Sequence, residues 1–173
     1  MTVHDTDVKV VVEDSKHVVD LANVLKQLLS NNETFKKCSF KIDDQTKETF
    51  IYILDKYPEY FSEFKTILEL IIEDGKLNID DFTNIIKLLT KLYELVKTLK
   101  LDYDTSLKVS GDILKFILYY LIEEKKMKIT NKDESAVSSS INTLIDACIE
   151  LLRQNKQIEK GCTSFFKKLM CRK

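Results

Sequence analysis

Histidine and cysteine, two side chains that often carry chemistry in proteins, are few in this 173-residue chain. Its two histidines, His4 and His17, both lie near the N-terminus. Neither takes part in a recognisable Ser-His-Asp or Cys-His arrangement. The chain also has no phosphate-binding loop, dinucleotide fingerprint or HExxH motif. We therefore expect a protein that is not an enzyme, with no catalytic, cofactor-binding or metal-binding residue and no small-molecule substrate.

The segment 73–81, Glu-Asp-Gly-Lys-Leu-Asn-Ile-Asp-Asp, resembles the second half of an EF-hand calcium loop. Gly75 would take loop position 6 and Asp81 position 12. Positions 1 and 3 would then be apolar residues, which offer no oxygen ligand to a hard cation. We interpret the segment as a turn in which Gly75 ends one helix and Asp80 caps the next.

Three acidic pairs each precede a helical stripe of apolar residues: Asp43-Asp44, Asp80-Asp81 and Asp133-Glu134. Paired carboxylates can act as general acid and general base. At the start of a helix, however, carboxylates accept hydrogen bonds from the free N–H groups and stabilise the helix dipole. We therefore interpret all three pairs as helix caps.

The four cysteines, Cys38, Cys148, Cys162 and Cys171, do not show the paired CxxC spacing of a zinc site. Cys148 lies on an apolar stripe, where a thiol behaves as a small buried hydrophobe. Cys162 and Cys171 are candidates for a disulfide, either within one chain or between two chains. The alternative is that both remain free thiols.

The composition predicts an all-α fold. Three glycines and one proline are too few for the tight turns of a β-rich domain, whereas helical bundles need few of either. We expect a single-domain bundle of about six helices over 14–157, preceded by an extended arm over 1–13 that contains a β-branched run. A basic amphipathic tail over 158–173 completes the chain.

Apolar residues at three- and four-residue spacing define the six expected helices. They begin near residues 14, 43, 58, 80, 105 and 133. The helix over 105–126 is apolar nearly all round between Ile113 and Ile122, which predicts a central position in the bundle. No apolar run is long enough to span a membrane, and no secretory signal opens the sequence, so we expect a protein that is not secreted.

Several apolar positions exceed what one inward stripe on each helix requires: Leu88, Leu95, Tyr119, Tyr120, Ile149 and Leu151. We expect some of them to be exposed and to mediate self-association or docking on another protein. The alternative is that the helices cover one another.

The charge of the chain is strongly asymmetric. Residues 153–173 carry seven basic residues and one acidic residue, which leaves a net charge of −7 on the rest of the chain. We expect this tail to contact an acidic partner, and a solvated tail is the alternative. The partner would be another protein subunit, a membrane surface or nucleic acid. We expect Gly161 to separate the tail from the preceding helix. The candidate contact residues in the tail are Phe165, Phe166, Lys167, Lys168 and Arg172.

The segment 107–112 matches the LxxxGD core of a BH3 segment and resembles the viral Bcl-2-like inhibitors, which are all-helical and of this size. This resemblance implies an alternative function, in which a surface groove binds a BH3-type helix.

The segment 71–81, leading into the apolar residues 85–89, resembles small helical proteins of large nucleocytoplasmic DNA viruses, in which an EDGK turn joins two apolar helices. This resemblance implies a structural role without catalysis, as a minor capsid protein or another virion component. It further implies a location in the virion, or in the host cytoplasm during infection, and partners that are other copies or coat proteins.

Overall fold

The structure is a computed structural model that describes residues 21–72, 77–124 and 134–170, with the side chains of 21–71, 77–124 and 135–156. The described residues form helices and no strand, which confirms the predicted all-α class. Residues 21–30 are helical. The other elements are α2 (Asn32–Lys37), α3 (Asp44–Lys56), α4 (Tyr60–Ile72), the 3₁₀ helix η1 (Ile79–Asp81), α5 (Phe82–Lys97), α6 (Tyr103–Glu123) and α7 (Glu134–Met170). The expected extended arm, 1–13, lies outside the described residues.

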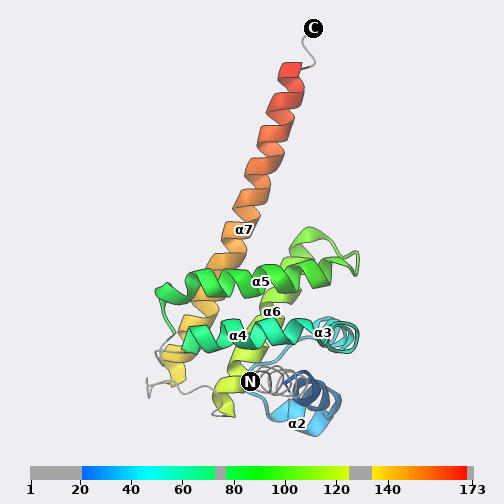
Figure 1. Ribbon diagram of the computed structural model, residues 1–173, viewed down its shortest axis with the longest axis vertical. Coiled ribbons are helices and arrows are strands. Elements are labelled where there is room, and N and C mark those ends of the chain that lie inside the picture. Colours follow the sequence, from blue (N-terminus) through cyan, green and yellow to red (C-terminus); the bar gives the residue numbers. More distant parts are fainter. Residues whose placement is uncertain (1–20, 73–76, 125–133, 171–173) are drawn as a thin grey trace, which may run out of the picture.

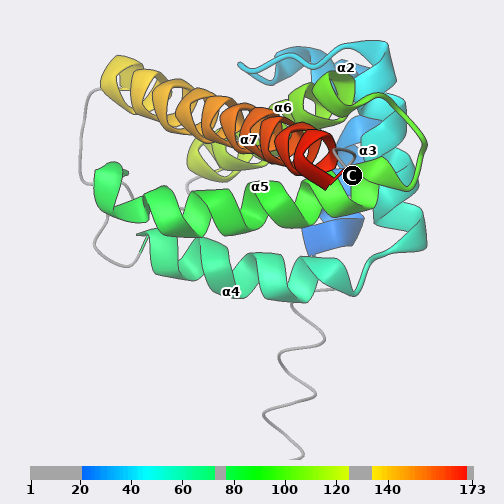
Figure 2. The ribbon, with the colours of Figure 1, turned by 90° about the horizontal axis from the view of Figure 1, so that it is seen from above.

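Helix α5 lies between α4 on one side and α6 with α7 on the other (Figure 2). Most of the stripe predicted for this helix is buried (Ile85, Leu89, Leu92 and Val96), and its other members, Phe82, Ile86 and Tyr93, are half-buried. Because α5 is covered from two sides, it buries more than the single stripe that a surface helix buries.

The central position predicted for the helix near 105–126 is confirmed. Helix α6 contacts α3, α5 and α7 and is buried on almost all of its surface. Only one narrow stripe, at residues 108, 112, 115 and 119, is not fully buried over the middle of the helix. The helix begins two residues before the predicted Thr105, because Asp102 caps it and accepts a hydrogen bond from the backbone N–H of Thr105 at 3.0 Å.

The predicted cap at Asp43 is confirmed, since one of its carboxylate oxygens accepts from the backbone N–H of Thr46 at 2.8 Å. The predicted cap at Asp80 is wrong. Asn78 caps the turn η1 instead, and the Asp81 carboxylate accepts from the backbone N–H of Asn78 in return, at 2.9 Å. A 3₁₀ turn therefore precedes α5 and moves the cap two residues earlier in the chain.

The expected break at Gly161 is also wrong. Helix α7 runs for 37 residues, from Glu134 to Met170, and passes through Gly161. A single glycine costs a helix only about 1 kcal/mol relative to alanine, so it does not by itself end a helix of this length. No helix of the described residues combines the length and the apolar character needed to cross a membrane.

Candidate interaction surface

Helix α7 leaves the body of the molecule and continues well beyond it (Figure 1). Its first half packs on α5 and α6, and residues 157–170 extend past the bundle. At 1.5 Å per residue these 14 residues reach about 21 Å. We call residues 157–170 the α7 extension. The α7 extension therefore lies past α5 and α6, the helices that cover the first half of α7.

The point at which α7 leaves the body, which we call the α7 root, is held by residues at the start of α6. The Tyr103 hydroxyl donates a hydrogen bond to the backbone oxygen of Leu152 at 2.8 Å. The guanidinium of Arg153 binds the Asp104 carboxylate at 3.1 Å, and the Lys156 ammonium lies 3.3 Å from the centre of the Tyr103 ring. These contacts fix the direction in which the α7 extension leaves the bundle.

A close crossing of α6 and α7 lies below the α7 root. A Cβ atom placed on Gly111 would lie 2.5 Å from the Cδ1 atom of Ile149. Glycine at this position therefore leaves room for the Ile149 side chain of α7. Gly111 also belongs to the BH3-like segment 107–112, in which Leu107 is buried as well. The match to a BH3 segment thus coincides with residues that pack inside the bundle.

Tyr119 links α6 to α7 and to the segment before α3. Its ring stacks on Phe40 with 5.0 Å between the ring centres. Its hydroxyl donates to the backbone oxygen of Ser138 and accepts from the side-chain amide of Asn142, each at 3.2 Å. The half-buried Tyr119 therefore makes contacts within its own chain, and its neighbour Tyr120 is buried.

The structure places Leu88 and Leu95 inside the bundle, with 0% and 4% of their surface exposed. The expectation that these two leucines and Tyr120 would be exposed is wrong, because α5 and α6 are covered by neighbours on more than one side. Ile149 is buried too. Among these extra apolar positions, Leu151 is the one confirmed as exposed, at 38%, and it lies at the α7 root.

Among the described side chains, four exposed apolar residues were not predicted, and the two most exposed of them lie on either side of one segment, while the others are Tyr52 and Tyr60. Leu70 near the end of α4 is 52% exposed, and Ile79 in η1 is 71% exposed. Both flank the segment 73–76, which lies outside the described residues.

The predicted contact residues of the tail fall in two parts of the chain. Phe165, Phe166, Lys167 and Lys168 belong to the helical α7 extension, so all four follow the direction that the α7 root sets. Cys162 is part of the same helix. Arg172 and Cys171 lie outside the described residues, and the disulfide between Cys162 and Cys171 stays a prediction.

The α7 root itself was not predicted from the sequence. Its hydrogen bond between Tyr103 and Leu152, and its ion pair between Asp104 and Arg153, each join residues 49 positions apart. Tyr103 and Asp104 look like an ordinary helix start in the sequence. No local pattern marks them as partners of a distant helix.

Two of the acidic groups singled out in the sequence, Asp43 and Asp81, serve as helix caps. Hydrogen bonds from Thr46 and from the Lys108 ammonium lower the pKa of Asp43 from 3.8 to about 2. Asp81 completes the cap of η1. Over the described residues, no group of three or more His, Cys, Asp or Glu side chains is placed to hold a metal ion. His4, His17 and Asp133 lie outside that part of the chain.

Comparisons with protein-family models, with curated proteins and with solved structures found no match to this chain.

Proposed function

We propose that this protein is a non-enzymatic structural or scaffold protein that works through helix-mediated contacts with other protein subunits. The single observation that carries the proposal is the continuous helix α7, which is anchored in the core over its first half and extends beyond the bundle over its second half. The α7 extension lies past the described helices that form the core. Its use is to contact another molecule.

The chemistry of the α7 extension supports protein contacts. Its sequence combines apolar residues (Ile158, Phe165, Phe166, Leu169 and Met170) with the basic residues Lys160, Lys167 and Lys168. An amphipathic helix of this kind is a common recognition element for a second protein. The rigid α7 root supports the same proposal, because a fixed helix loses less conformational entropy on binding than a free tail does.

The finer proposal places the protein in a virus particle, as a minor capsid protein or another virion component. It rests on the resemblance of the segment around 71–81 to small helical proteins of large DNA viruses. The partners would then be coat proteins or further copies of the chain.

A truncation tests the proposed function. A chain that ends at Lys156 keeps the contacts of the α7 root and loses the α7 extension. We expect it to fold with unchanged stability of the bundle, and we expect the full-length chain, but not the truncated one, to be present at fixed stoichiometry in purified particles.

Three results would contradict the proposal. Incorporation of the truncated chain at the same level as the full-length chain would show that the extension is not the contact element. A loss of several kilocalories per mole in unfolding free energy would show that the extension belongs to the core. Tight binding of BH3 peptides to a monomeric chain would favour the Bcl-2-like function instead.

A further inference from the structure

We propose that the α7 extension pairs with the α7 extension of a second copy of this chain, in an antiparallel two-helix coiled coil. The inference rests on the proposed function, because it names the partner that the extension contacts. It starts from the spacing of residues along the whole of α7.

One stripe of residues runs along α7 with alternating steps of four and three. Its members are Val137, Ile141, Leu144, Cys148, Leu151, Asn155, Ile158, Cys162, Phe165 and Leu169. Asn155 is the one residue of the stripe with a strongly polar side chain. This spacing is that of the a and d positions of a coiled coil, at which one helix packs against another.

The first half of the stripe is buried against the chain's own helices. Val137, Ile141, Leu144 and Cys148 are between 0% and 7% exposed, where α7 contacts α5 and α6. From Leu151, which is 38% exposed, the stripe continues beyond these helices. The same packing surface is therefore covered from within the chain up to Cys148 and extends past that cover from Leu151.

The regular spacing indicates that a helix packs on the second half of the stripe. A stripe of a and d positions accepts the side chains of a second helix that has the same spacing, and another copy of α7 supplies that spacing. A partner helix would need a width of only about 10–12 Å beside the body at Leu151. A flat membrane surface would meet the body of the protein at that point.

The position of the helical bundle limits the orientation of the second copy. Below Leu151, α5 and α6 already lie on the stripe. A parallel partner would carry its own α7 into that occupied space. An antiparallel partner instead brings the end of its α7 extension to the α7 root, and its body lies at the opposite end of the pair.

The antiparallel pairing has a register in which every layer joins an a position to a d position. Leu151 meets Leu169 of the second copy, Asn155 meets Phe165, and Ile158 meets Cys162. Asn155 falls in the second layer from the end of the pair, next to the α7 root, where it is exposed in the single chain.

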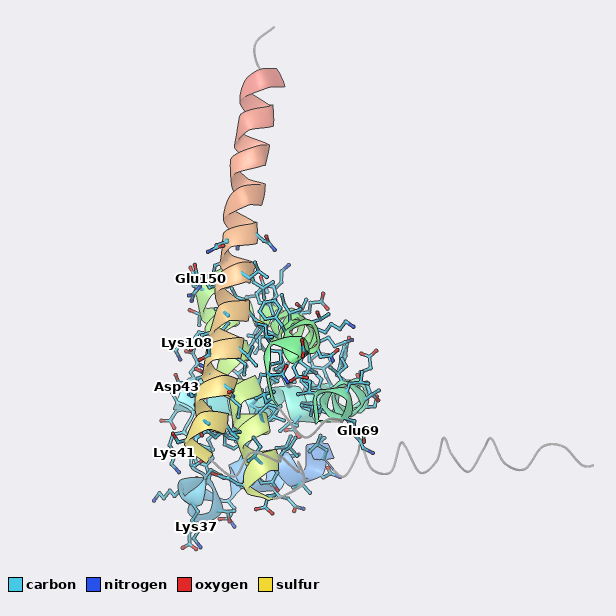
Figure 3. All side chains as sticks on the ribbon, turned by 90° about the vertical axis from the view of Figure 1, so that its left-hand side faces the viewer. Lys37, Lys41, Asp43, Glu69, Lys108 and Glu150 are labelled. Carbon is cyan, nitrogen blue, oxygen red and sulfur yellow. The ribbon has the colours of Figure 1, made fainter. Side chains whose placement is uncertain are left out.

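The α7 root carries two acidic residues, both paired with Arg153, near the level that the basic end of a second α7 extension would reach. Asp104 and Glu150 lie at the root with 72% and 58% of their side chains exposed, and Figure 3 shows Glu150 near the level at which α7 leaves the body. In this register Lys167 and Lys168 of the second copy reach the same level. Two antiparallel helices also bring opposite ends of their dipoles together.

Light scattering on the full-length chain is the first test. We expect a mass of twice the 20.2 kDa of the chain at high concentration. The variant F165K places a charge on the stripe and should halve that mass. Its matched control, S164K, adds the same charge one position away from the stripe and should leave the dimer intact.

Crosslinking tests the orientation. Differently tagged copies carrying L151C or L169C, in a background of C162A and C171S, are mixed and oxidised. We expect a disulfide between the L151C chain and the L169C chain, and none between two L151C chains.

A disulfide between two L151C chains would show a parallel pair and overturn the proposal. A monomer at all concentrations would overturn it too, including a monomer that binds anionic vesicles through the extension. If the monomeric chain still requires residues 157–173 to enter particles, this inference fails while the proposed function stands. If the truncated chain also enters particles normally, both fail.

Discussion

Replacing Gly111 by alanine should lower the unfolding free energy of the natural chain and raise that of a chain that carries I149V. In the natural chain the added methyl group would lie 2.5 Å from Cδ1 of Ile149, roughly 1 Å closer than carbon atoms normally approach. Overpacking of this kind costs about 1–3 kcal/mol. Alanine is about 1 kcal/mol better than glycine within a helix. The net result for G111A should be a loss of about 1 kcal/mol in unfolding free energy.

The variant I149V removes the one atom that causes the clash. The other two nearest atoms to the added methyl group lie 3.6 Å away, which is ordinary contact. Alone, I149V should cost about 0.5–1.5 kcal/mol. In the I149V background, G111A should then stabilise the protein by about 1 kcal/mol through helix propensity. The coupling energy between the two sites is the difference between the two effects, about 2 kcal/mol, which is large for a pair in contact.

Urea unfolding followed by far-ultraviolet circular dichroism measures the four free energies, and it suits a chain without tryptophan. The slope of unfolding free energy against urea concentration should be the same for the natural chain, G111A, I149V and the double variant, so that their free energies are comparable. An equal stabilisation by G111A in both backgrounds would refute the reasoning. It would mean that the Ile149 side chain rotates away from the added methyl group without cost.

Three further predictions concern single positions. Asp43 has a pKa of about 2 in the folded chain, below its ordinary 3.8. Its contribution to the unfolding free energy is therefore complete above pH 4 and disappears as the pH falls toward 2. Because the Asp43 side chain is 53% exposed, D43A should lower the unfolding free energy by only about 1 kcal/mol at neutral pH. The variant D43N keeps the cap, so it should lower the unfolding free energy by less and make it depend less on acid pH. Unfolding measured at a series of acid pH values will show both effects. G161A should increase the helix content of the α7 extension, measured by circular dichroism, without changing the unfolding free energy of the bundle by more than a few tenths of a kcal/mol. Burial raises the pKa of the Cys148 thiol to about 11, so a thiol reagent at neutral pH should label it only on unfolding, and rapid labelling of the native chain would contradict its burial.

The sequence predicts the fold class well because amphipathic stripes and caps are local. The stripe of α5 and the Asp43 cap of α3 are both confirmed, since each depends on residues within a few positions of one another. The short helix α2 was not predicted. It has Phe35 as its one large apolar residue and so shows no stripe, and it depends on Asn31, whose side chain accepts from two backbone N–H groups.

The candidate surface was only partly predictable, because exposure depends on how many neighbours a helix has. Leu88 and Leu95 lie off the main stripe of α5, and the sequence alone does not show that α4 covers one side of this helix while α6 and α7 cover the other. The basic and apolar tail was recognised from its composition. Its direction was not, because Gly161 was expected to interrupt a helix that continues through it.

The uninterrupted course of α7 also makes this helix a spacer of fixed length and fixed angular phase. Every residue inserted between the α7 root and Ile158 would lengthen the spacer by about 1.5 Å and turn everything beyond it by about 100°. Seven inserted residues would add about 10 Å and restore nearly the same facing, whereas four would leave the far end turned by about 40°. The distance and the rotation between the bundle and whatever α7 contacts are therefore set by the number of residues in one helix.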